Sequence, residues 1–82
     1  MGKLFLSKPP DKNWALQYEG STTKIRGEIL SEMGRGGLLQ EAQGFLQSDN
    51  PEYLMVEFWH GDDDVILNQS LAFAEKYGYE LE

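Results

Sequence analysis

The chain of 82 residues contains no cysteine and a single histidine. Without cysteine it has no disulfide framework, no thiol nucleophile and no cysteine-ligated zinc, and one histidine excludes a multi-histidine metal site. Basic residues are also scarce, because 7 Lys and Arg stand against 14 Asp and Glu, for a net charge of -7. This excess of acid repels nucleic-acid phosphates, so we expect no direct nucleic-acid partner.

Long apolar runs are absent as well. The first apolar run covers only Leu4 to Leu6 and is soon followed by Pro9 and Pro10. Secretory signals and membrane spans need longer stretches, so we expect a cytoplasmic protein without membrane contact. Hydrophobic residues still make up 40% of the chain, including 4 Phe, 4 Tyr and 2 Trp. That content is sufficient for one small core, and we expect residues 1–82 to form a single domain.

Alternating apolar and polar residues predict three strands. Lys3 to Ser7 is the first, and Asn13 to Glu19 is the second, whose alternation predicts an antiparallel strand with one face buried. Tyr53 to His60 has the strongest strand pattern. Its two faces are both largely apolar, which is typical of a central strand or of a strand whose second face meets a partner.

Residues 22–33 fit two periodicities, and the sequence leaves both open. As a helix, the stretch places Ile25 and Ile29 on one face and pairs Lys24 with Glu28. As a strand, it alternates apolar with charged residues and follows a tight turn at Gly20. Further on, Leu38 to Leu46 predicts a short amphipathic helix. The chain from residue 48 to residue 51 is expected to turn.

The clearest helix follows Gly61. Asp62 is expected to supply the N-cap oxygen, Asp63 and Asp64 suit the positive end of the helix dipole, and Gly78 is a natural C-cap. Its expected apolar surface comprises Ile66, Leu67, Ser70, Leu71, Phe73, Ala74 and Tyr77. The last four residues fit either a frayed tail or a final strand.

Strands and helices in this order predict an α+β fold. We expect a small two-layer sandwich in which two or three helices pack on one face of an antiparallel or mixed sheet of three or four strands.

Two segments contain residues that suit ligand binding or chemistry. Asp62 to Asp64, next to His60, suggest a cation site, but consecutive helical residues diverge by about 100° each and cannot all converge on one ion. Helix capping is the better interpretation, and we expect no metal and no cofactor. A turn at Gly34 to Gly37 could hold an anionic group with Arg35 beside Gly36 and Gly37, although it lacks the other marks of a nucleotide loop.

The acidic residues are unevenly distributed. Residues 1–35 carry a net charge of +2, whereas residues 36–82 carry -9. The acidic part includes the strand whose second face holds Tyr53, Met55, Glu57 and Trp59. Aromatic anchors beside carboxylates are typical of a surface that binds a basic protein, and Asp62 and Asp63 extend this candidate surface.

The leading hypothesis is a small, acidic, non-enzymatic protein-binding module. Within this class, an inhibitor or immunity-type protein that masks the nucleic-acid-binding surface of a basic partner fits the charge best. One alternative is an accessory domain that binds a small anionic ligand at Gly34 to Gly37. A second is a homo-oligomer assembled through the Tyr53 to His60 strand. Whether the Tyr53, Met55 and Trp59 face is open or covered cannot be read from the sequence.

Overall fold

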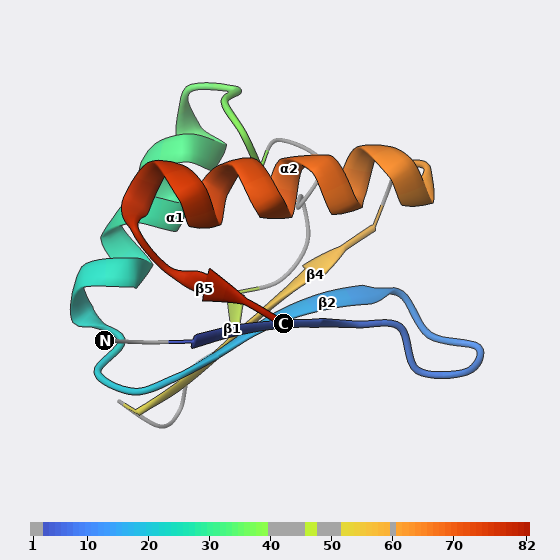
Figure 1. Cartoon of the computed structure of the whole chain (residues 1–82), viewed down its shortest axis with the longest axis horizontal. Coiled ribbons are helices and arrows are strands. Elements are labelled where there is room, and N and C mark those ends of the chain that lie inside the picture. The colour runs from blue at the N-terminus through green and yellow to red at the C-terminus, as the bar shows by residue number, and fades with distance from the viewer. Residues whose placement is uncertain (1–2, 40–45, 48–51, 60) are drawn as a thin grey trace.

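Two helices lie on the same face of a mixed five-stranded sheet in the computed structural model, which describes residues 3–39, 46–47, 52–59 and 61–82 (Figure 1). The strand order is β3-β4-β2-β1-β5. The elements are β1 (Lys3–Ser7), β2 (Trp14–Glu19), α1 (Thr23–Gly34), β3 (Leu46–Gln47), β4 (Tyr53–Phe58), α2 (Asp63–Tyr77) and β5 (Glu80–Leu81). The α+β two-layer sandwich expected from the sequence is therefore confirmed.

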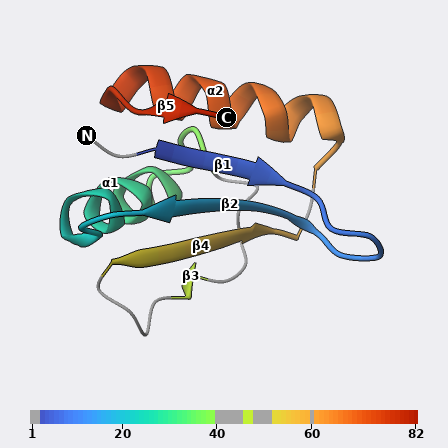
Figure 2. The same cartoon turned by 60° about the horizontal axis from the view of Figure 1, so that its bottom comes forward.

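The pairing of the strands decides which side chains face the helices. β2 lies between β1 and β4 and runs antiparallel to both, as Figure 2 shows. Leu16 is opposite Leu6 on one side and Val56 on the other. Since side chains alternate along a strand, these positions and those two residues away share one face. The two helices cover this face, which is called the inner face, and the opposite side of the sheet is called the outer face (Figure 1).

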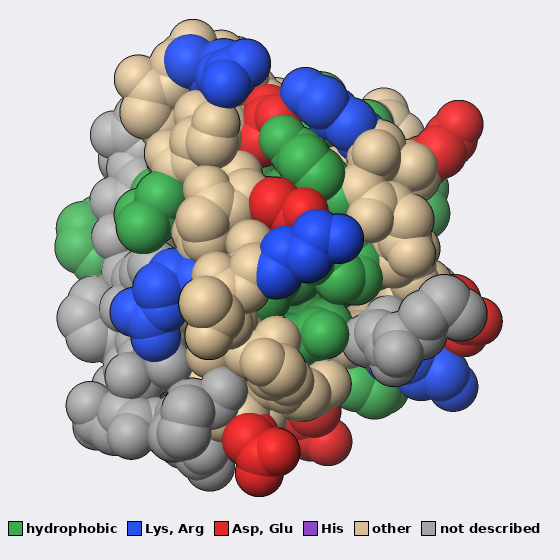
Figure 3. All heavy atoms as spheres, turned by 90° about the vertical axis from the view of Figure 1, so that its left-hand side faces the viewer, with side chains coloured by type: hydrophobic (Ala, Val, Ile, Leu, Met, Phe, Trp, Pro, Cys, Tyr) green, Lys and Arg blue, Asp and Glu red, His purple; other side chains and the backbone are tan. Residues whose placement is uncertain are grey.

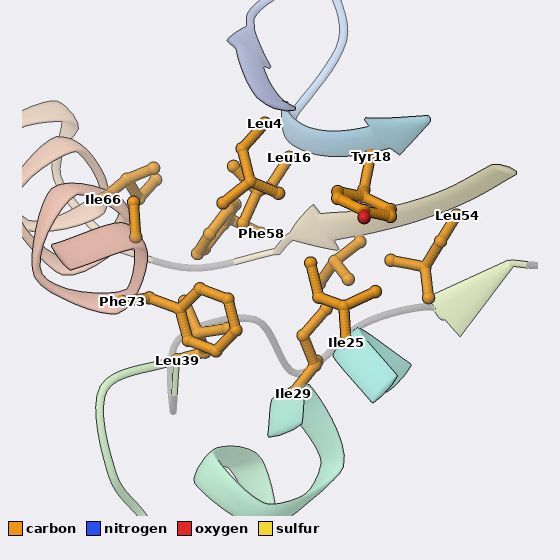
Figure 4. Packing of buried hydrophobic residues seen from close by; sticks show 12 residues of the cluster. Leu4, Leu16, Tyr18, Ile25, Ile29, Leu39, Leu54, Phe58, Ile66 and Phe73 are labelled. Carbon is orange, nitrogen blue, oxygen red and sulfur yellow. The ribbon is translucent and has the colours of Figure 1, made fainter. Parts of the chain in front are cut away.

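The hydrophobic core fills the space between the inner face and the two helices (Figure 4). α1 contributes Ile25 and Ile29, one helical turn apart, and α2 contributes Ile66 and Phe73. All four side chains are at most 2% exposed. They meet the strand residues Leu4, Leu16, Tyr18, Leu54, Val56 and Phe58, together with Leu39, which follows α1.

The ambiguous stretch at residues 22–33 is helical, so the strand alternative is wrong. Burial of Ile25 and Ile29 against the sheet favours the helix, because most helical stability in proteins comes from packing one face. The expected pair between Lys24 and Glu28 is present, with Nζ and Oε2 4.0 Å apart. Gly27 lies on the exposed side of the helix, where it weakens α1 without disturbing the core.

α2 was predicted correctly in its extent but not in two of its details. Asp62 occupies the N-cap position, yet its side chain makes no capping hydrogen bond, and its carbonyl oxygen accepts from the Ile66 N–H instead. Leu67 and Leu71 were expected in the packed surface but are 45% and 47% exposed. The reason is that α2 contacts the side of the sheet formed by β1 and β5, so only a narrow stripe of the helix faces the core.

Two short strands complete the sheet and raise their number above the expected three or four. Leu46 was expected to end a helix but begins β3, which pairs with β4; residues 40–45 and 48–51 lie outside the described residues. Of the two structures expected for the last four residues, a frayed tail or a final strand, the strand is present as β5. It runs parallel to β1, and the Glu82 N–H donates to the Leu4 carbonyl over 2.9 Å.

Two glycine substitutions are expected to change stability in opposite directions. Gly78 ends α2 with φ of 80°, a left-handed conformation that costs a residue with a side chain about 1–2 kcal/mol. Gly78→Ala should therefore lower Tm by several degrees. Gly27→Ala should raise the unfolding free energy by about 0.5–1 kcal/mol, because a Cβ at position 27 meets nothing within 4 Å.

Thermal unfolding followed by circular dichroism checks this pair of variants. The two substitutions make the same chemical change, so they separate the backbone requirement at Gly78 from the general effect of adding a methyl group. Equal shifts of Tm in the same direction would contradict the assignment of Gly78 as the left-handed end of α2.

Candidate functional site

The outer face of the sheet has no helix packed on it among the described elements (Figure 1). The strand register arranges its side chains in rows. One row consists of Phe5, Gln17 and Met55, and the next places Ala15 opposite Glu57. The predicted partner-binding residues Tyr53, Met55 and Glu57 all belong to this face. Each of the three is partly exposed.

A hollow of about 440 Å³ lies on the outer face beside the β1–β2 loop. The small side chain of Ala15 leaves room between Glu57 and the row that contains Gln17 and Met55. The loop provides the remaining lining with Pro9, Asp11, Lys12 and Asn13. It turns tightly there, with the Lys12 N–H donating to the Pro9 carbonyl over 3.1 Å.

Met55 and Glu57 are the two predicted site residues that line the hollow. The Met55 sulfur accepts a weak hydrogen bond from the Gln17 side-chain amide at 3.9 Å. Glu57 is partly buried, and its carboxylate makes no hydrogen bond or ion pair with any described residue. A carboxylate accepts several hydrogen bonds, so this one presents unused acceptor capacity at the edge of the hollow.

The two predicted aromatic anchors lie apart from each other. Trp59 directly follows β4 and is 53% exposed. Tyr53 begins β4, six residues earlier, which corresponds to about 20 Å along an extended strand. In register, Trp14 pairs with Phe58, so Trp59 lies at the end of β4 nearest the β1–β2 loop. Trp59 therefore lies at the end of β4 that is close to the hollow, and Tyr53 lies at the other end of the strand.

Asp62 and Asp63, the remaining predicted contact residues, begin α2. Asp63 has a structural role, because its Oδ1 accepts a hydrogen bond from Trp14 Nε1 at 2.8 Å. Lys8 Nζ lies 4.0 Å from the same oxygen. These contacts join the start of α2 to the β1–β2 hairpin. Asp62 and Asp64 are exposed.

The Gly34 to Gly37 turn is occupied by groups of the chain itself. The Gly36 N–H donates to the Met33 carbonyl, and the Gly37 N–H donates to the Glu32 carbonyl over 2.7 Å. Arg35 donates to the Ser31 hydroxyl at 2.9 Å. The turn also follows the C-terminal end of α1, where the helix dipole is negative. This geometry does not favour a foreign anion at Arg35, Gly36 and Gly37.

Glu32 is the polar residue that the sequence interpretation overlooked. It is 1% exposed, and its carboxylate accepts from the Leu38 N–H at 2.9 Å, Lys76 Nζ at 2.7 Å and the Tyr77 hydroxyl at 2.5 Å. These donors, led by the Leu38 N–H, lower the pKa of Glu32 to about 2. The same contact raises the pKa of Lys76. Glu32 therefore joins the ends of both helices.

The acidic character of the chain is not uniform over its surface. Figure 3 shows the side of the molecule that lies at the left of Figure 1, with Lys and Arg side chains placed among acidic and apolar ones. The start of α2 and the β1–β2 loop lie at the opposite end (Figure 1). The β1–β2 loop, which lines the hollow, therefore lies at the same end of the molecule as Asp62, Asp63 and Asp64.

Neither helix combines the length and apolar character that a membrane crossing needs, within the described part of the chain. Three or more His, Asp or Glu side chains do not gather into a metal-binding group among the same residues. In comparisons with known proteins, no family model, no curated protein and no solved structure matches this chain.

Proposed function

We propose that this protein is a small, non-enzymatic binding module that docks a basic protein on the outer face of its sheet. The observation that carries the proposal is the combination of an exposed Trp59 with a partly buried Glu57 that has no partner among the described residues, both at one end of this face. Exposed tryptophan provides affinity in protein interfaces, and complementary charge provides orientation and rapid association.

The net charge of -7 favours a basic partner over an acidic one. An acidic protein attracts basic partners at a distance and repels acidic ones, and this attraction weakens as salt screens it. Surfaces that bind nucleic acids are strongly basic, because their Lys and Arg side chains neutralise phosphates. We therefore propose that the module acts as an inhibitor or immunity-type protein that masks such a surface.

Trp59→Ala is expected to weaken binding to the native partner at least tenfold, because a central interface tryptophan often contributes 2 kcal/mol or more. Glu57→Lys should weaken it as well and should reduce its dependence on salt. The partner is first isolated from host extract with the tagged wild-type protein. Its Kd is then measured by calorimetry for each variant at low and high salt.

Leu30→Ala is the matched control. Leu30 is 50% exposed, close to the exposure of Trp59, but lies on α1 in the helical layer. It should bind as the wild type does. If the Leu30 variant loses affinity while Trp59→Ala and Glu57→Lys retain it, the interface lies on the helices and the proposal is wrong. A captured protein whose affinity responds to none of the three variants also contradicts it.

A further inference from the structure

We infer that the hollow on the outer face receives the guanidinium group of an arginine side chain from the partner. This inference rests on the proposed function, and it adds the chemistry of the group that is recognised. The volume of about 440 Å³ lies within the ~300–1,000 Å³ range of small-molecule sites. It is therefore large enough for one long side chain.

Charge and hydrogen-bonding capacity in the hollow favour a cation. Asp11 and Glu57 contribute two carboxylates to the lining, one from the β1–β2 loop and one from β4. Asn13 and Gln17 add amide oxygens, which also accept hydrogen bonds. Among the described lining residues Lys12 is the one with a basic side chain, and it is exposed, so its ammonium group can extend into solvent.

Arginine fits these acceptors better than lysine does. The guanidinium group carries five N–H donors in a plane, so it can reach a carboxylate with two of them and still donate to neighbouring oxygens. Its flat faces are weakly hydrated and suit an apolar floor. Ala15 and Met55 supply that floor. Glu57 is the principal acceptor, because its carboxylate is partly buried and makes no hydrogen bond or ion pair within the part of the chain that the structure describes.

The test uses N-acetylarginine amide as the probe and N-acetylcitrulline amide, its uncharged isostere, as the control ligand. Both are titrated into ¹⁵N-labelled protein and followed by NMR. We expect the arginine probe to shift the side-chain amides of Asn13 and Gln17 and the backbone amide of Ala15, with a Kd of about 1–10 mM. The citrulline compound should cause at most a fifth of these shifts at equal concentration.

Three variants locate the interaction. Glu57→Gln and Asp11→Asn remove one carboxylate each at nearly constant size, and asparagine tolerates the positive φ of 58° at position 11. Each should weaken the arginine probe at least threefold. Ala15→Leu should fill the hollow and abolish the shifts. Asp64→Asn removes an exposed carboxylate outside the hollow and should leave the Kd unchanged.

Equal shifts with citrulline, shifts spread over exposed carboxylates elsewhere, or no shifts at all would each overturn the inference. The result is separable from that of the proposed function. If the arginine probe fails while partner binding still depends on Trp59, the binding module stands and the hollow has no role in it. If partner binding depends on neither Trp59 nor the hollow variants, the proposed function itself is wrong.

Discussion

Glu32→Gln is expected to lower the free energy of unfolding by about 1–3 kcal/mol, because it removes a buried charge that accepts three hydrogen bonds. The Leu38 N–H, Lys76 and Tyr77 all donate to the Glu32 carboxylate. Glutamine keeps the shape but offers one acceptor oxygen and two unwanted donors. Urea denaturation at neutral pH measures the difference.

The effect of this substitution should depend on pH in a defined direction. The pKa of Glu32 is lowered from 4.5 to about 2 in the folded protein. A carboxyl group with a lowered pKa stabilises the fold fully above its unfolded pKa and loses that contribution as pH falls towards the folded pKa. Wild type and Glu32→Gln should therefore differ fully at pH 7 and should converge between pH 4.5 and pH 2.

Glu28→Gln is the matched control for the same measurement. Glu28 also accepts a hydrogen bond on α1, from the Tyr79 hydroxyl at 2.5 Å, but it is partly exposed. Its substitution should cost less, because water can partly replace the hydrogen bond that a partly exposed carboxylate loses. A constant difference between wild type and Glu32→Gln from pH 7 to pH 2 would show that the charge of Glu32 contributes nothing to stability.

Phe73→Ala is expected to cost about 3–5 kcal/mol, the typical loss for removing a buried phenylalanine. Phe73 is fully buried, and its ring lies 4.8 Å from that of Tyr77 and 6.2 Å from that of Tyr79, measured between centroids. A domain of this length has about 4–12 kcal/mol of stability in total. The variant should therefore lose a large part of its stability, as thermal unfolding followed by near-ultraviolet circular dichroism would reveal.

Leu71→Ala tests the other side of α2. Leu71 is 47% exposed, so its truncation should change stability by less than about 0.5 kcal/mol. Phe73→Leu, which retains most of the apolar volume, should fall between the two and remain folded if Phe73→Ala does not. A large loss of unfolding free energy for Leu71→Ala would mean that this residue is packed, as the sequence pattern predicted. The buried face of α2 would then be wider than the structure shows.

Local patterns were sufficient for the elements that follow one strict period. Alternation placed β1 and β2 almost to the residue, and it placed Leu54, Val56 and Phe58 on the buried face of β4. The helical period failed in part for α2, since it groups Leu67 and Leu71 with Phe73 without showing how wide a stripe the sheet covers. Residues 22–33 needed the sheet as well, because both periods bury Ile25 and Ile29.

The candidate site was only partly visible in the sequence. Met55, Glu57 and Trp59 stood out because apolar and acidic residues share one face of a strand. Ala15 and Asp11 gave no signal of a hollow, since it depends on pairing β2 with a strand about forty residues away in the chain. Glu32 did leave a trace. It lies seven residues after Ile25, on the apolar side of α1, where an acid is unexpected.

The sequence by itself determined that helices form one layer and strands the other, that the chain is acidic, and that cysteine and multi-histidine chemistry are excluded. These depend on residue types and on short periods, which act locally. Only the tertiary structure decided that Glu57 borders a hollow, that Asp63 accepts a hydrogen bond from Trp14, and that the Glu32 carboxylate accepts one from the Leu38 N–H. Each of these contacts joins residues from different elements, and strand register and helix placement decide which residues meet.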